Sequence, residues 1–489
     1  MNSIHSHEMM RFTTAMCALL AFGNAQWVFA QGDPSKAYET CKHWELIEQI
    51  RAYEDTLAFE ASAPDTLRGE YGQQVRDLNE TLKSYRLYRC AALLDTIAAL
   101  QAEVDFAQAD PPVVDTDSIS AITGSSATFH AKVTSDGGLP VSNQWFRYGT
   151  SSTSLTDSVA VSGTATPFSK NVTALSAGQY YVAGFANNAK GTSSGDTLSF
   201  WIPVAPTLDT DSTSVLTATS VTLHAKVTSN GNGTISAQWF RYGLTAASLT
   251  DSVAVVGTST SFTAALTGLD PATRYYFAAF AENAAGSATG DTLSFLTRCS
   301  VDSVLHQSYY YGVIQAETQC WFDENLRTAV YNNNDSIPAG FTNAQWGALT
   351  TAGRSEPNGS EANVATYGRL YNWYAVSDSR GLCPSGWHVP SEDGLDSLFV
   401  FLGGDAVAGG KLKAAAPDWN GTDDIGFRVL QAGGRTAAGA FFTTNAGFWT
   451  STVDSATQSV RVFFSDSSTA AVVAAQNKKL GLSVRCLQD

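Results

Sequence analysis

The sequence GLCPSGWHVPS at residues 381–391 is followed, near the end of the chain, by GLSVRC at residues 481–486. Cys-Pro and Gly-Trp are typical of an irregular loop, whereas Ser391 is a favourable helix N-cap. After Ser391, apolar residues recur at helical spacing: Leu395, Leu398, Phe399 and Leu402. We therefore predict a loop, then a helix, and a strand that ends the chain.

The length and composition of the chain indicate several domains and an extracellular type of protein. The chain has 489 residues, which is too long for one hydrophobic core. Apolar residues make up 44% of it and charged residues only 15%, a balance typical of extracellular β-rich modules. The formal net charge is -16, so the surface repels phosphate backbones and anionic lipids. We therefore expect neither nucleic acid nor a peripheral membrane as partner.

The N-terminus has the pattern of a secretory signal. Arg11 precedes an interrupted apolar run over residues 16–29, and small residues such as Ala30 suit signal peptidase. We predict a signal peptide at 1–30, with cleavage before Gln31, and a secreted or cell-surface protein. A transmembrane anchor is the alternative, but the run is short and broken.

Cysteine usage fits an oxidising compartment. Of the seven cysteines, six remain after removal of the signal peptide. No cysteine pair has zinc-ligand spacing. Their distribution favours pairing within domains: Cys41–Cys90, Cys299–Cys320 and Cys383–Cys486.

Residues 31–110 show a helical pattern. Apolar residues recur at helical spacing on both sides of Pro64, which breaks the run into two helices. Cys41 and Cys90 lie at similar distances from Pro64, so a disulfide can cross an antiparallel hairpin. We predict a helical hairpin that serves as a stalk or cap; a coiled coil that mediates oligomerisation is the alternative.

The middle of the chain repeats itself. FHAKVTS at 129–135 returns as LHAKVTS at 223–229, and QWFRYG at 144–149 returns at 238–243, each displaced by 94 residues. Two tandem domains follow.

Each repeat alternates apolar and polar residues in short segments, as antiparallel sandwiches do. LDPATRY at 269–275 resembles the tyrosine corner of fibronectin type III domains, so we assign such repeats to 111–203 and 204–298. The resemblance implies spacers or protein-binding modules. Trp145 and Trp239 are expected in the cores; stacking on a carbohydrate is the alternative.

The remaining residues, 299–489, are rich in Trp, Tyr, Asn and Gly. Blocks such as QCWFDENLR at 319–327, YGRLYNWYA at 367–375 and CPSGWHVP at 383–390 resemble the Fibrobacter succinogenes major paralogous domain. The resemblance implies a secreted bacterial protein whose C-terminal domain has a C-type-lectin-like, α+β fold. The chain is thus expected to be multidomain: a helical hairpin, two all-β sandwiches and this α+β domain.

Candidate ligand-binding residues lie on loops of this last domain. Glu356-Pro357-Asn358 matches a sugar-binding triplet of calcium-dependent lectins, but it precedes the helix, which favours coincidence. The loop at 418–424 offers several oxygen ligands, so a calcium site is considered there, with a solvated turn as alternative. Trp346 and Trp419 are expected to be exposed for stacking on a sugar or a partner. The predicted ligand-binding residues are Trp346, Trp419, Asn420, Asp423 and Asp424, and the calcium ligands are Asp418, Asp423 and Asp424.

No catalytic constellation is evident. His388 has no nearby cysteine or carboxylate that would make a catalytic pair, so it is interpreted as structural. Lectin-like folds also support formylglycine-generating oxidases, but those need a reactive cysteine. We therefore expect a non-enzymatic adhesion protein that binds a glycan or a surface protein. A spacer or assembly component of the envelope or matrix is the alternative, and an oxidase-type enzyme is less favoured.

Overall fold

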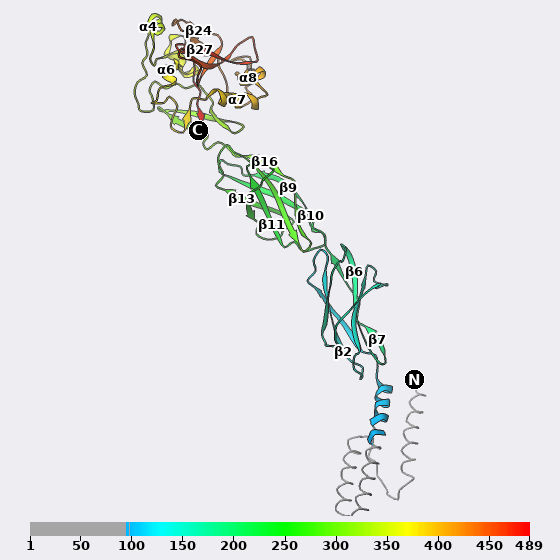
Figure 1. Cartoon of the computed structure of the whole chain (residues 1–489). Coiled ribbons are helices and arrows are strands. Elements are labelled where there is room, and N and C mark those ends of the chain that lie inside the picture. Colours follow the sequence, from blue (N-terminus) through cyan, green and yellow to red (C-terminus); the bar gives the residue numbers. More distant parts are fainter. Residues whose placement is uncertain (1–93, 97) are drawn as a thin grey trace, which may run out of the picture. The chain divides into compact units, whose positions relative to one another are not determined.

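A computed structural model describes residues 94–96 and 98–489 (Figure 1). The predicted signal peptide, the Cys41–Cys90 pair and most of the predicted hairpin lie outside the described residues. Residues 98–108 are helical. Among the residues that the structure describes, no helix is long and apolar enough to span a membrane.

The first repeat folds into two antiparallel sheets. One has the order β1-β2-β5, and the other has the order β4-β3-β6-β7, with β8 also paired to β6. The strands are β1 (Val113–Ser120), β2 (Ala127–Ser135), β3 (Asn143–Gly149), β4 (Asp157–Ala160), β5 (Phe168–Val172), β6 (Gly178–Asn188), β7 (Gly191–Ser194) and β8 (Leu198–Ile202).

The second repeat has the same arrangement strand for strand. Its sheets have the orders β13-β10-β9 and β12-β11-β14-β15, with β16 paired to β14. The strands are β9 (Thr207–Ser214), β10 (Ser220–Ser229), β11 (Ala237–Gly243), β12 (Asp251–Ala254), β13 (Ser261–Thr267), β14 (Arg274–Asn283), β15 (Gly286–Thr289) and β16 (Leu293–Leu296). The predicted fibronectin type III-like sandwiches are confirmed.

The tyrosine corner of the second sandwich is present. The main-chain N–H of Asp270 donates a hydrogen bond of 3.1 Å to the hydroxyl of Tyr275, whose ring is buried against Phe295. The corner therefore fixes the residues that lead into β14, as the sequence predicted.

The prediction that Trp145 and Trp239 are core residues is wrong. Each is only partly buried, on the outer face of the larger sheet, whereas the next residue, Phe146 or Phe240, is fully buried. Successive side chains of a strand point to opposite faces. In a segment with Trp and Phe adjacent, the phenylalanine takes the inner position and the tryptophan the outer one.

The C-terminal domain contains both helices and strands. A five-stranded antiparallel sheet has the order β17-β18-β19-β28-β22, and a three-stranded sheet has the order β25-β26-β27. These strands are β17 (Ser303–His306), β18 (Tyr309–Ala316), β19 (Gln319–Phe322), β22 (Trp387–His388), β25 (Ala446–Val453), β26 (Gln458–Phe464), β27 (Ala471–Asn477) and β28 (Leu487–Gln488).

Short elements connect the two sheets. Two pairs of short strands, β20 with β21 and β23 with β24, lie between helices and irregular loops. The bounds are α4 (Asn343–Ala348), β20 (Arg354–Ser355), η1 (Pro357–Gly359), η2 (Glu361–Asn363), α5 (Val364–Tyr367), β21 (Leu370–Tyr371), α6 (Trp373–Val376), α7 (Glu392–Phe401), α8 (Asp405–Leu412), β23 (Gly434–Arg435) and β24 (Phe441–Phe442).

Helix α7 forms where the sequence predicts it. The Ser391 side chain accepts a hydrogen bond from the main-chain N–H of Gly394, which satisfies a free donor of the first turn. Leu395, Leu398 and Phe399 are buried. The predicted strand at 482–486 instead makes isolated bridges, and the final strand β28 begins directly after it.

Two disulfides are present as predicted. Cys299 bonds Cys320, and Cys383 bonds Cys486 across a sequence separation of 103 residues. The second disulfide ties the loop before α7 to the residue before β28. In the chain-entropy view, closing so long a loop stabilises the domain by about 4–5 kcal/mol.

Candidate functional site

The three carboxylates of the acidic loop at 418–424 each have a local partner. Asp418 pairs with the Arg428 guanidinium at 2.9 Å, and Asp423 accepts the main-chain N–H of Arg428 at 2.7 Å. Asp424 accepts the Thr422 hydroxyl at 2.5 Å. Across residues 94–96 and 98–489, no group of three His, Cys, Asp or Glu side chains is arranged to hold a metal ion. Because these carboxylates are directed to local partners, the geometry lends no support to the calcium site, which stays a prediction.

Trp419 and Asn420 are structural anchors. Trp419 is only 6% exposed, so the expectation of an exposed stacking ring is wrong. Its indole N–H donates to the Asp466 carboxylate at 2.5 Å, and the Asn420 amide donates to the Asp466 main-chain oxygen at 2.7 Å. Both residues therefore bind the loop that follows β26 to the loop that follows α8.

Lys413 also binds the loop that follows β26. Its side chain is fully buried, and its ammonium donates to the main-chain oxygens of Ser465 at 3.0 Å and Ser468 at 2.9 Å. Burial lowers the pKa of Lys413. The ammonium thus satisfies carbonyl groups of a tight turn and lies 5.3 Å from the Trp419 ring.

Trp346 is also buried, contrary to the expectation that it is exposed. It lies on α4 with 0% of its surface accessible. Its indole N–H donates to the Lys479 main-chain oxygen at 2.7 Å, and the Lys479 ammonium donates back to the Gly347 oxygen at 2.8 Å. This reciprocal pair joins α4 to the turn after β27.

Arg435 completes that anchor. Its guanidinium lies 4.5 Å from the Trp346 ring and donates to the main-chain oxygens of Gly439 at 2.8 Å and Phe341 at 2.6 Å. The residue is buried, and burial lowers its pKa. One cation therefore holds both the loop before α4 and the turn between β23 and β24.

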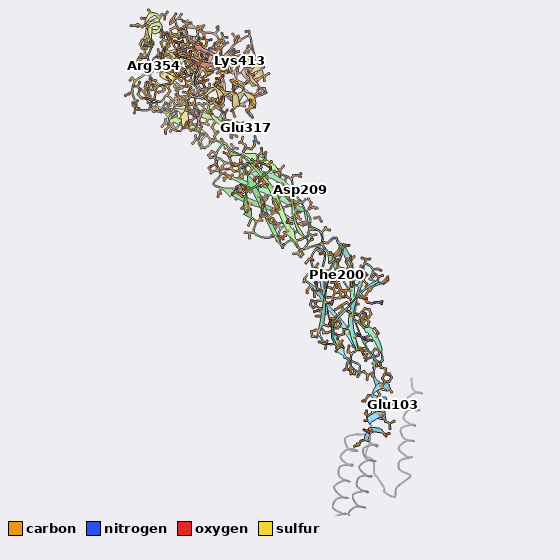
Figure 2. All side chains as sticks on the ribbon, in the orientation of Figure 1. Glu103, Phe200, Asp209, Glu317, Arg354 and Lys413 are labelled. Atoms are coloured by element: carbon orange, nitrogen blue, oxygen red, sulfur yellow. A yellow bond between two sulfur atoms is a disulfide. The ribbon has the colours of Figure 1, made fainter. Side chains whose placement is uncertain are left out.

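The Glu356-Pro357-Asn358 triplet belongs to an ion-pair network. The Glu356 carboxylate lies 2.6 Å from Arg354 and 2.9 Å from Arg369, and Arg369 also pairs with Glu361 at 2.5 Å. Its bond with Arg369 lowers the pKa of Glu361. The triplet therefore does not present a free carboxylate, which agrees with its interpretation as a coincidence. Figure 2 shows Arg354 and Lys413 on different sides of the domain.

The network supports an exposed surface that we call the loop face, formed by Asn358, Glu361, Phe441 and Phe442. Asn358 is exposed in the left-handed conformation at φ 51°, and the Glu361 side chain is 68% exposed. Phe441 and Phe442 are partly buried, and η1 packs against their strand β24. Carboxylate, amide and aromatic groups thus meet on a surface with fixed supports.

The C-terminal domain with these anchors corresponds to a known family. Residues 314–488 match the family model of the Fibrobacter succinogenes major domain. This confirms the resemblance for that segment of the chain. A search of curated proteins gives no match.

Solved structures with similar parts were also found. The FN1–FN3 domains of chicken CNTN1 are 19% identical, with 39% of this chain and 68% of that chain covered and a TM-score of 0.28. Titin domains A168–A170 are 16% identical, with 39% and 67% covered and a TM-score of 0.25. The sensor domain of the anti-sigma factor RsgI4 of Pseudobacteroides cellulosolvens is 19% identical, with 19% and 95% covered and a TM-score of 0.16.

The C-terminal domain also contains a buried cation, Arg485, that could not be predicted from the sequence. Arg485 donates to the Asn325 side-chain oxygen at 2.7 Å and to the main-chain oxygen of Phe427, whose ring lies 4.3 Å away. Burial lowers the pKa of Arg485 to about 9. The only signal in the sequence is one arginine inside the otherwise apolar VRC end of the chain.

The two histidines of the C-terminal domain, His306 and His388, have defined partners. His388 Nδ1 lies 2.6 Å from the Asp489 carboxylate on the surface, a partner 101 residues away that the sequence did not reveal. His306 is buried, bonds the Leu382 main-chain oxygen at 3.0 Å, and has its pKa lowered by burial. Each imidazole is thus bound to a group that fixes the chain locally.

Proposed function

We propose that this is an extracellular, adhesion-type, non-enzymatic protein whose C-terminal domain recognises a glycan or a surface protein. The architecture supports the extracellular assignment, because tandem fibronectin-like sandwiches and disulfides accompany the Fibrobacter-type segment. We further propose that the C-terminal domain is C-type-lectin-like. Its support is that the last strand, β28, pairs between β19 and β22, which joins the end of the domain to its beginning.

The observation that carries this proposal is the fixation of long irregular loops by buried polar side chains. Arg435, Trp346 and the Glu356 network hold the loops that bear the loop face. A surface that is already rigid loses little conformational entropy when a ligand binds. Such preorganised loops suit recognition.

Thiol chemistry has no support in the described residues. The four cysteines that the structure describes are joined in two disulfides. An oxidase of the formylglycine-generating type uses a free reactive thiolate. Non-enzymatic binding is therefore the function that we propose.

A spacer or assembly role is the second candidate. The two sandwiches have the same strand order and are held by packing alone, which suits a tandem spacer. The two candidates differ in one respect: a spacer has no saturable ligand at the loop face.

The test is a glycan array with the full chain and with a variant that carries Asn358→Ala and Glu361→Gln. Both side chains are exposed, but Glu361 pairs with Arg369 and Asn358 is in the left-handed region, so the variant must first show the circular dichroism and melting temperature of the unmodified chain. We expect saturable binding that the variant loses, both with calcium and with a chelator. Turnover of a bound polysaccharide would contradict the proposal, and no binding to glycans or to extracellular proteins would favour the spacer.

A further inference from the structure

The outer face of the larger sheet carries the same aromatic pair in both sandwiches. Trp145 of β3 lies beside Phe185 of β6, with ring centroids 5.6 Å apart and ring planes 16° apart. Trp239 of β11 lies beside Phe280 of β14 at 5.4 Å and 12°. These pairs are cross-strand neighbours on the sheet face opposite the core.

The second face of each indole has no large neighbour in its strand pairing. On the side away from the phenylalanine, Trp145 pairs with Ala160 and Trp239 pairs with Ala254. Both alanines are exposed, and a methyl group is too small to cover an indole ring. Each tryptophan is itself partly exposed, so part of its apolar ring surface is accessible to a flat ligand.

A cation accompanies each aromatic pair. The guanidinium carbon of Arg147 lies 6.0 Å from the Phe185 ring, and that of Arg241 lies 5.7 Å from the Phe280 ring. Both arginines are exposed, and within the described part of the chain neither forms an ion pair. The chain has 29 basic and 45 acidic residues, so most basic side chains could find an acidic partner. In the part of the chain that the structure describes, each of these two arginines instead leaves its positive charge unpaired beside a partly exposed tryptophan.

We infer that Trp145 with Phe185, and Trp239 with Phe280, form two sugar-stacking subsites at which Arg147 and Arg241 select a sugar that bears a carboxylate. The apolar C–H face of a pyranose stacks on an indole, and a guanidinium fork binds a carboxylate through two parallel hydrogen bonds. The ligand class is thus an acidic polysaccharide built from uronic acids. This goes beyond the proposed function, because it assigns binding to the sandwiches.

Charge near the two subsites is not identical. Two residues beyond the phenylalanine, the first sandwich has Asn187 and the second has Glu282, on the same face of the strand. At physiological ionic strength, charges interact over about 8 Å, so the acidic residues of the rest of the chain are largely screened while Glu282 is not. The first subsite should therefore bind an acidic sugar more tightly than the second.

The test is equilibrium dialysis of the full chain against tetragalacturonate, with the neutral cellotetraose in parallel. The unmodified chain should take up two acidic oligomers, Trp145→Ala or Trp239→Ala should take up one, and the double variant none. Arg147→Gln together with Arg241→Gln should weaken uptake about tenfold, as expected for one lost charge-assisted hydrogen-bond pair per site. Tyr310→Ala, an exposed aromatic residue elsewhere, should change nothing.

Three results would overturn the inference: no uptake by the unmodified chain, uptake that survives both tryptophan substitutions, or equal uptake of the neutral oligomer. The arginine variants keep the test valid if a tryptophan variant unfolds, because both arginines are exposed. Substitutions at the loop face should leave this uptake unchanged, so the inference and the proposed function can fail separately.

Discussion

Replacing Trp346 by alanine should destabilise the C-terminal domain and should not merely weaken a ligand contact. The side chain is fully buried on α4, and its N–H bonds the Lys479 oxygen. A buried tryptophan removes roughly 150–250 Å² from water, worth about 4–6 kcal/mol at 25 cal/mol/Å². Measured truncations of buried Phe and Trp cost about 3–5 kcal/mol. We expect a loss of about 4 kcal/mol.

The matched control is Trp201→Ala in the first sandwich. Trp201 is 44% exposed, so on the same area scale its truncation should cost about 2–3 kcal/mol, roughly half of the area estimate for Trp346. Because a chain of several domains does not unfold in one step, urea unfolding should be followed by hydrogen exchange in peptides from each domain. Peptides of α7 and β26 report on the C-terminal domain, and peptides of β6 report on the first sandwich.

A loss for Trp346→Ala that is no larger than the loss for Trp201→Ala would refute the assignment of Trp346 as a buried anchor. It would restore the expectation of an exposed ring available to a ligand.

Three further predictions concern the same domain. Trp419→Phe, which removes the bond to Asp466, should lower the free energy of unfolding by about 1–2 kcal/mol, and calcium should not shift the melting temperature of either protein. Pairing with Arg380 lowers the pKa of Asp378 to about 2, below its usual 3.8. The ion pair therefore stabilises the protein above pH 4, and this stabilisation is lost toward pH 2. In acid-unfolding experiments, the stability of Asp378→Asn should therefore differ from that of the unmodified protein at pH 6 and converge with it at pH 2. Cys383→Ser should cost about 4–5 kcal/mol in thermal unfolding under oxidising conditions, and a reductant, which also opens Cys299–Cys320, should destabilise the unmodified chain by at least as much.

Features that depend on local or repeated patterns could be predicted from the sequence. The two sandwiches follow from self-similarity over 94 residues, and α7 follows from the Ser391 cap and the spacing of its apolar residues. Pairing within domains follows from the distribution of the cysteines, although the four cysteines of the C-terminal domain allow three pairings, of which the structure shows Cys299–Cys320 and Cys383–Cys486. For the sandwiches and for α7, the determining residues are adjacent or repeated in the sequence.

The candidate site could not be predicted in the same way, because its interactions join distant residues. Trp346 lies 133 residues from the Lys479 oxygen that it binds, and Trp419 lies 47 residues from Asp466. Glycine and asparagine around them suggest exposed loops, but these distant partners bury the rings. Trp145 was misplaced for another reason: with Phe146 adjacent to it, alternation allows either residue to face the core.

Buried polar anchors hold the irregular loop at residues 331–363 rigid. Hydrogen exchange of the full chain tests this rigidity most directly, because main-chain N–H groups such as those of Arg354 and Trp346 bond to main-chain oxygens inside the domain. We predict protection in this segment comparable to that of β26, and its loss in Arg435→Gln. Complete exchange of the segment within seconds in the unmodified chain would contradict the account.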